Sequence, residues 1–268
     1  MGKTNLLESI EFISQLRSNR ALSAKDLIKN NENHALVKAQ INSTDVFKIN
    51  LFRKGSKKVY INDLLLKKQS TIKNYIRSVS FCSSDINIIR GEPNFRRLWL
   101  DRVIAQFEPV YFDLLSRYSK LLKQRGHFWR SEISKNPGSG ELLESFDSQM
   151  ALVGTRILRR RNRALSQLKP HIEYWHNHLC KSRENIDLTY VSSIQDFDNI
   201  CDNEKEIINQ LSQLLLGQRN VEEITSKCNI GPHRDDIEFL LNGVSVRKYG
   251  SSGQQRTITL ALKMAELD

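Results

Sequence analysis

Hydrophobic residues recur at helical spacing in several stretches of the chain. Leucines and isoleucines three or four positions apart predict a helix over residues 4–17. From residue 101 a seam of aromatic and aliphatic side chains steps by three and four, and a second long seam runs from about residue 141 to residue 180. A turn rich in glycine, proline and serine at residues 136–140 separates them. The two seams predict an antiparallel helical hairpin, either coiled or packed as an ordinary globular bundle.

Prolines and polar stretches limit these helices. Pro109 is expected to kink the first turns of the first seam, and Pro170 to kink or break the second. Residues 185–206 are polar and acidic, which predicts a loop or linker. Residues 204–226 predict another helix or two, and a last helix is expected after Ser252 and Gly253.

Alternation with a period of two predicts strands in three places. Residues 35–62 alternate on both sides of a break at Lys54-Gly55-Ser56, which predicts a hairpin within an antiparallel meander. A short strand is expected at residues 77–83. Residues 236–246 alternate around Asn242-Gly243, which predicts a second hairpin.

The net positive charge of the chain indicates that its binding partner is a polyanion. The 268 residues carry 41 Lys and Arg against 30 Asp and Glu, a formal net charge of +11. The excess lies in residues 1–100, which hold 18 basic and 8 acidic side chains, and in residues 154–184, which hold 8 and 2. Residues 101–153 are balanced, and residues 185–268 are acidic. Nucleic acid is the commonest polyanion, although a solvated basic surface would give the same composition.

Two groups of side chains are the candidate contacts to DNA phosphates. One group consists of lysines in and beyond the first hairpin: Lys54, Lys57, Lys58, Lys67 and Lys68. The other is an arginine run in the second long helix: Arg159, Arg160 and Arg161. Such contacts would make binding depend on salt and only weakly on sequence. The alternative for the arginine run is a solvated helix face.

Other classes of protein are excluded or disfavoured. No window approaches the roughly 18 apolar residues of a spanning helix, and the first residues resemble neither a secretory leader nor a myristoylation signal. Four scattered cysteines are typical of reduced thiols in a cytoplasmic protein. His171, His176 and His178 lie near Cys180, but their spacing is no known ligand set, so we expect no zinc site there.

The first residues carry the sharpest chemical motif. Gly2-Lys3-Thr4 leads straight into a predicted helix, as in the second half of a phosphate-binding loop. In that motif backbone N–H groups hold the phosphates, the lysine reaches the β- and γ-oxygens, and the threonine holds Mg²⁺. Lys3 and Thr4 would take those roles. The triplet alone is a weak signal, because it is common by chance.

Three further segments have the composition of functional sites. Ser251, Gly253 and Gln254 stand at the start of the last helix, either as an anion site or as an ordinary helix cap. Residues 84–101 contain the pair Arg96 and Arg97, which would meet phosphates or pair with nearby carboxylates. Residues 231–236 read GPHRDD.

In this order and spacing, the four segments closely resemble those of the RecF family of DNA-repair ATPases, which is related to ABC and SMC-type ATPases. The resemblance covers essentially the whole chain. Residues 2–8 match the end of the Walker A motif, and residues 84–101 and 231–236 match two further family stretches, with Ser84 where the family prefers proline. Ser251, Gly253 and Gln254 match the signature motif that reaches across a dimer to ATP.

The resemblance implies a fold and its division. We expect an α/β P-loop NTPase of the ABC/SMC head type, incomplete, with antiparallel strands and an inserted helical lobe. Residues 1–100 would form part of the ATPase lobe, residues 101–230 the helical lobe, and residues 231–268 a hairpin and signature helix returning to the head. The first half of Walker A and the Walker B strand are absent from these residues, which resemble an internal fragment of the family protein.

The resemblance also implies a function. It predicts an ATP-dependent protein of recombinational repair, replication and the SOS response that binds single-stranded or gapped DNA. ATP and Mg²⁺ would be its cofactors, a homodimer its ATP-bound form, and RecO- and RecR-type proteins its partners, with no membrane involved. The family is a weak ATPase, and this chain by itself is expected to bind ATP weakly or not at all. The alternative is a non-catalytic helical DNA-binding module without nucleotide.

Overall fold

The chain forms two compact units in the computed structural model, residues 1–80 and residues 81–268. The structure describes residues 2–16, 18, 21, 23–41, 44–66, 75–76, 78–135, 138–180 and 184–268. Among them, no helix has the length and apolar character needed to cross a membrane.

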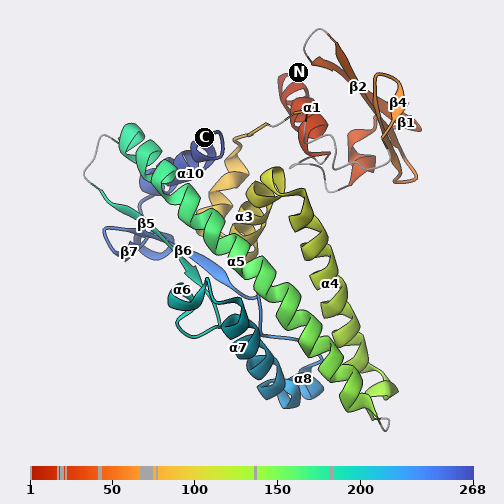
Figure 1. The fold of residues 1–268 in the computed structure, drawn as a ribbon. Coiled ribbons are helices and arrows are strands. Elements are labelled where there is room, and N and C mark those ends of the chain that lie inside the picture. The colour runs from red at the N-terminus through yellow and green to blue at the C-terminus, as the bar shows by residue number, and fades with distance from the viewer. Residues whose placement is uncertain are drawn as a thin grey trace. The chain divides into compact units, whose positions relative to one another are not determined.

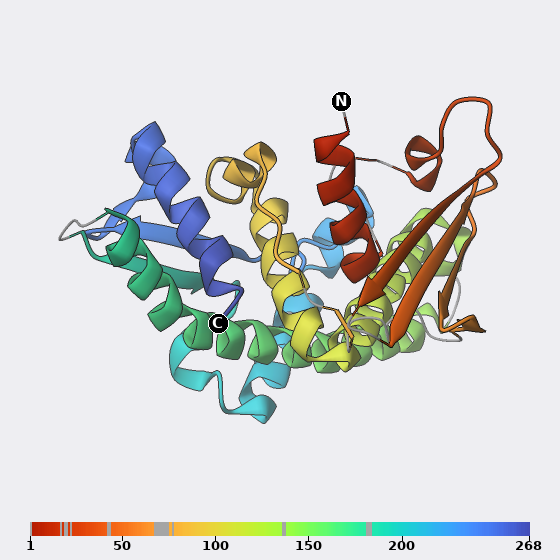
Figure 2. The same cartoon turned by 90° about the horizontal axis from the view of Figure 1, so that it is seen from above.

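A helix and an antiparallel sheet form the first unit (Figure 2). Helix α1 spans Lys3–Gln15, and the sheet has the order β1-β2-β3-β4. Its strands are β1 (His34–Ile41), β2 (Asp45–Phe52), β3 (Lys57–Ile61) and β4 (Leu64–Leu65), with a short 3-10 helix η1 (Ala24–Leu27) before them. Alternate residues of β2 and β3 are buried with the apolar face of α1, and they form one core: Phe12, Ile13, Leu16, Ile28, Phe47, Ile49, Leu51, Val59 and Ile61.

The predicted first hairpin is confirmed. Strands β2 and β3 pair antiparallel in a register that sets Leu51 opposite Lys57, and Gly55 in the turn has a φ of 88°. The predicted helix near the start is confirmed as α1. The predicted strand at residues 77–83 does not form where this segment is described, at residues 78–83. There side-chain contacts hold the backbone in place instead of a ladder, such as the Ser80 hydroxyl donating to Glu11 at 2.7 Å.

The unit boundaries differ from the predicted ones at residues 100 and 230. Helix α3 (Pro93–Phe107) runs across the first of these positions. Residues 231–268 belong to the same compact unit as the helical hairpin, because strand β6 and helix α10 pack into the same core as α3, α4 and α5.

Three long helices form the frame of the second unit (Figure 1). They are α3, α4 (Pro109–Arg130) and α5 (Ser139–Cys180), with 3-10 helix η4 (Glu132–Lys135) after α4. Helices α4 and α5 lie side by side and antiparallel, so the predicted helical hairpin is confirmed. Helix α5 also packs against α7, α10 and β5, as in a globular bundle.

Prolines act differently from the prediction. Pro109 does not kink one long helix but starts a new one, since α3 ends at Phe107 and Pro109 takes the first position of α4. A proline lacks the N–H that is unsatisfied at a helix start, so this position suits it. Pro170 lies inside α5, which continues to Cys180 without the predicted break.

A second antiparallel sheet, of order β5-β6-β7, packs against α5 and α3. Its strands are β5 (Ile186–Val191), β6 (Asp236–Leu241) and β7 (Val244–Ser245). The hairpin at Asn242-Gly243 is confirmed, with φ values of 51° and 77°. The predicted loop at residues 185–206 is wrong, because its alternate apolar side chains are buried in β5.

The remaining helices complete the second unit. Before α3 lie η3 (Ser83–Ile86) and α2 (Asn87–Arg90). After β5 come α6 (Phe197–Ile200), α7 (Glu204–Gly217) and α8 (Arg219–Thr225). Helices α7 and α8 confirm the prediction at residues 204–226, whereas α6 lies in the segment predicted to be a loop. The chain then reaches α9 (Val246–Tyr249) and α10 (Ser252–Ala265), the predicted last helix.

Candidate functional site

The Gly2-Lys3-Thr4 motif lies at the start of α1. Gly2 is the N-cap residue and has a φ of 114°, in the left-handed region that glycine adopts without strain. Gly2 has no side chain with which to cap this end of the helix, and Thr4 is exposed. The N-terminus of an α-helix carries a partial positive charge, which suits an anion. The Lys3 side chain lies outside the described part of the chain.

The signature segment forms the N-terminus of α10. The Ser251 Oγ accepts from the Gln254 backbone N–H at 3.2 Å, and the Gln254 side-chain oxygen accepts from the Ser251 N–H at 2.8 Å. This is a capping box, so the helix-cap alternative holds. It does not exclude the anion site, because Ser251 and Gly253 are exposed and the serine proton is left to donate.

Arg90 adds a positive charge to this helix end. Its Nη2 donates to the Ser252 Oγ at 2.9 Å, and its Nε donates to the Gln255 side-chain oxygen. Gln255 in turn donates to the Val246 carbonyl at 3.0 Å. The sequence analysis missed this role, because no periodicity links Arg90 of α2 to a helix that starts far along the chain.

The segments at residues 84–101 and 231–236 pack against each other. Arg96 is buried and binds the Asp236 carboxylate through two nitrogens, at 2.6 and 2.9 Å. Arg97 donates to the Asp235 carbonyl at 2.5 Å. Arg96 thus pairs with a carboxylate, but with one that lies far along the chain and not with a neighbour in its own segment. The two segments thus fix α3 to the start of β6.

Gly231, which begins the second of these segments, cannot be replaced by a larger residue without strain. It has a φ of 115°, and a Cβ atom there would lie 2.3 Å from the Tyr118 Oη. The glycine therefore lets this turn approach α4 closely.

Arg161 is buried, so its prediction as a DNA contact is wrong. It donates to both carboxylate oxygens of Asp101, at 2.8 and 3.0 Å, and to the Pro232 carbonyl at 2.5 Å. It also donates to the hydroxyls of Tyr111 and Tyr190, both at 3.2 Å. A guanidinium enclosed by these acceptors cannot reach a phosphate outside the protein.

Arg159 and Arg160 remain partly exposed. Arg159 pairs with Glu204, and Arg160 pairs with Glu108 at 2.9 Å. Both side chains line a cleft of about 630 Å³ between α4, α5 and the segment that leads to α7. Two exposed arginines that the sequence analysis missed, Arg156 and Arg163, lie on the same cleft. The cleft residues are Val110, Leu114, Arg156, Arg159, Arg160, Asn162, Arg163, Ser166, Cys201, Asp202 and Glu204.

The hairpin lysines divide into two kinds. Lys54 and Lys58 are exposed, and the Lys58 ammonium lies 6.0 Å from the centre of the Phe52 ring. Lys57 instead donates to the Leu16 carbonyl at 2.9 Å, which ties β3 to the end of α1. Lys67 and Lys68 lie outside the described residues.

Curated relatives share the whole length of the chain. The protein named DNA replication and repair protein RecF from Synechococcus sp. (strain CC9605) is 42% identical over 269 residues, which cover all of this chain and 73% of that relative. The protein of the same name from Parasynechococcus marenigrum (strain WH8102) is also 42% identical, over 270 residues, with the same shares covered. This chain belongs to the RecF family. No family model matches it.

Solved structures agree with the RecF assignment. The structure described as the recombination mediator protein RecF-ATP in the RecFOR pathway has a TM-score of 0.87 to this chain at 30% identity, and the match covers 99% of this chain and 71% of that one. The RecF-ATPrS structure has a TM-score of 0.86 to this chain at the same identity. The predicted fold is confirmed as that of RecF, with antiparallel strands and a helical lobe, and it is incomplete because it matches 71% of those chains.

Asp235, in the segment at residues 231–236, has a carboxyl group whose pKa differs from its ordinary value. Asp235 is 4% exposed, and it accepts from the Tyr190 hydroxyl at 2.9 Å. Burial raises the pKa of Asp235 to about 6, against the lowering effect of Tyr190 and Arg161. The same burial lowers the pKa of His233 to about 4.

Asp235→Asn should therefore change how stability depends on pH. The folded chain holds the Asp235 proton more tightly than the unfolded chain, so this group lowers the free energy of unfolding as pH rises from about 4 to about 6. The asparagine variant has no such proton to lose. Its free energy of unfolding should therefore rise by about 2–3 kcal/mol relative to that of the wild type between pH 4 and pH 7. Urea unfolding at both pH values measures the difference, in which the opposite contribution of His233 cancels. An equal difference at both pH values would contradict the raised pKa.

Proposed function

We propose that this RecF family chain acts in DNA replication and repair by binding single-stranded or gapped DNA under the control of ATP. The observation that carries the proposal is the 42% identity to replication and repair proteins along its entire length. The RecF structures with ATP and its analogue support the nucleotide part. RecO- and RecR-type proteins would be its partners, as the RecFOR pathway in those descriptions suggests.

Two helix ends would hold the nucleotide between two copies of the chain. Gly2, Lys3 and Thr4 of one copy would bind the phosphates, with Thr4 on Mg²⁺. Ser251, Gly253 and Gln254 of the other copy would offer the uncovered end of α10 to the same phosphates. Bound nucleotide supplies the negative charge that joins these two positive ends. Arg90 supports the second end by holding Ser252 in place.

Ser251→Arg should abolish dimerisation by ATP, because the larger side chain would fill the end of α10 and remove its cap. We expect light scattering on the product of the complete gene, with ATP and Mg²⁺, to show dimers for the wild type and monomers for the variant. Ser148→Arg is the matched control, since Ser148 is exposed in the N-terminal part of α5. Dimers of Ser251→Arg at wild-type ATP concentration would contradict the assignment of the signature site.

DNA would lie on two basic surfaces, one in each unit. In the first unit the candidates are the exposed Lys54 and Lys58, with Lys57 between them, and also Lys67 and Lys68. In the second unit they are the cleft arginines Arg156, Arg159, Arg160 and Arg163. Arginines lining a cleft suit the phosphate backbone, because each can donate two parallel hydrogen bonds.

Replacing Lys54, Lys57 and Lys58 together with glutamine should weaken DNA binding. Fewer phosphate contacts release fewer counterions, so the slope of log affinity against log salt should flatten by roughly two. Fluorescence anisotropy at several salt concentrations measures it. The matched control replaces Lys25, Lys29 and Lys38, which are exposed in the same unit. A slope equal to that of the wild type would remove the hairpin from the DNA surface.

A further inference from the structure

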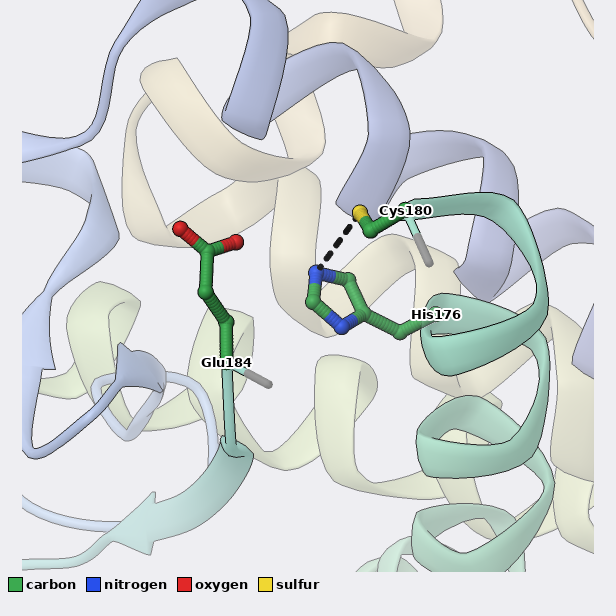
Figure 3. A group of neighbouring side chains, drawn as sticks. All are labelled: His176, Cys180 and Glu184. Carbon is green, nitrogen blue, oxygen red and sulfur yellow. Dashed lines mark hydrogen bonds between the residues drawn. The ribbon is translucent and has the colours of Figure 1, made fainter. Parts of the chain in front are cut away.

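Three potential metal ligands meet where α5 ends (Figure 3). His176 and Cys180 are four residues apart on α5 and therefore lie on one face of the helix. The His176 Nε2 is 3.5 Å from the Cys180 Sγ. Glu184 follows the helix, and Figure 3 shows its side chain beside the imidazole. One ligand atom from each residue lies within 4.8 Å of the other two.

These separations suit tetrahedral zinc. Zn–S bonds of about 2.3 Å and Zn–N bonds of about 2.0–2.1 Å, at a tetrahedral angle, place the sulfur and nitrogen about 3.5 Å apart. That is the separation found between Cys180 and His176. A Glu184 oxygen would complete a third corner after a movement of about 1 Å, which a flexible glutamate side chain can make. Water would take the fourth position.

His176 lacks good partners without a metal. Its side chain is fully buried, with 0% exposure. Its Nδ1 has no hydrogen-bond partner among the described residues, and its Nε2 has only the long contact to the thiol. The contact of Nε2 to sulfur is long, so this nitrogen is poorly satisfied at a buried position. A metal on Nε2 would give the imidazole a strong partner.

Glu184 is already oriented by a neighbour. The Gln254 Nε2 donates to its Oε1 at 2.8 Å, and Gln254 is itself fixed in the capping box of α10. Metal-ligating carboxylates are commonly held by such hydrogen bonds, which set their orientation.

We propose that His176, Cys180 and Glu184 form a zinc site that ties the end of α5 to the start of α10. The thiol of Cys180 loses its proton when the Zn–S bond forms, so binding releases a proton. The expectation of no zinc site near Cys180 rested on the spacing of His171, His176 and His178, whereas Glu184 completes a different spacing, H-x3-C-x3-E. The zinc proposal does not rest on the proposed function, although Gln254, which orients Glu184, also belongs to the proposed nucleotide site.

Titration of the 268-residue chain with Co²⁺ and Zn²⁺ tests the site. We expect one Co²⁺ per chain with the near-ultraviolet absorption of a cobalt–thiolate bond, displaced by Zn²⁺, and a higher thermal midpoint with zinc. Cys180→Ser should remove the absorption and weaken zinc binding by more than about tenfold, the loss that even an outer partner causes. Glu184→Gln, which changes a less buried position, should weaken zinc binding without removing the thiolate absorption.

The matched control is Cys201→Ser, which removes another partly buried free thiol. It should bind both metals like the wild type. Absence of the thiolate absorption in the wild type would overturn the proposal, and so would zinc affinity that is unchanged in Cys180→Ser or in Glu184→Gln. Loss of the absorption in Cys201→Ser alone would place the metal elsewhere and would also overturn it.

Discussion

Arg161→Leu is expected to destabilise the second unit by about 3–5 kcal/mol, the cost of leaving one partner of a buried ion pair alone. Arg161 is 3% exposed, and its guanidinium satisfies the Asp101 carboxylate, the Pro232 carbonyl and two tyrosine hydroxyls. Without it, the Asp101 charge has lost its counter-ion at a site that is mostly shielded from water. Urea unfolding followed by circular dichroism measures the loss.

The neighbouring arginine provides the control for Arg161→Leu. Arg160 is on the same helix, but its side chain is partly exposed and pairs with Glu108 at the surface. Arg160→Leu should change the free energy of unfolding by no more than about 1 kcal/mol. Adding Asp101→Asn to Arg161→Leu should recover part of the loss, because the isolated charge is removed. Equal losses for Arg160→Leu and Arg161→Leu would contradict a structural role for Arg161.

Replacing Arg156 and Arg163 together with glutamine should clearly weaken DNA binding. Both side chains are exposed on the α5 cleft, and Arg156 enters no ion pair in the described part of the chain. The loss of two phosphate contacts should flatten the slope of log affinity against log salt concentration by about 1.4–1.8. The two substitutions should change the free energy of unfolding by no more than about 0.5 kcal/mol, as most surface substitutions do. Fluorescence anisotropy with gapped DNA measures the slope.

The control for the arginine pair keeps the same change in net charge. Lys120 and Lys123 are exposed on α4, away from the residues that line the cleft. Replacing both with glutamine should leave the slope nearly unchanged. If this pair reduced the slope as much as the arginine pair, net charge rather than the cleft would account for binding.

The sequence predicted the hairpins and most helices because their signals are local. Alternation in β2 and the glycine turn determine the first hairpin, and Asn242-Gly243 determines the second. Strand β5 was missed although Ile186, Leu188 and Tyr190 alternate, because the polar residues around them outweighed a short pattern. Local composition cannot show that a partner strand lies far along the chain.

The arginine run shows why charge alone misplaced one site residue. Successive residues of an α-helix differ by about 100° in direction, so Arg159, Arg160 and Arg161 cannot share one face. Arg161 stands four residues after Ile157 and four before Leu165, both of which are buried. Its place between these residues accounts for its burial, but a guanidinium inside the core needs the acceptors of Asp101 and Pro232, which only the fold brings together.

Control of DNA binding by ATP is tested by the affinity of the complete gene product for gapped DNA, measured with and without ATP and Mg²⁺. We expect ATP to tighten binding by about fivefold or more, in the usual range of coupling between two sites. Ser251→Arg should remove this enhancement, whereas Ser148→Arg should keep it. Equal affinity of the wild type with and without ATP would contradict ATP control and favour a DNA-binding module that does not use nucleotide.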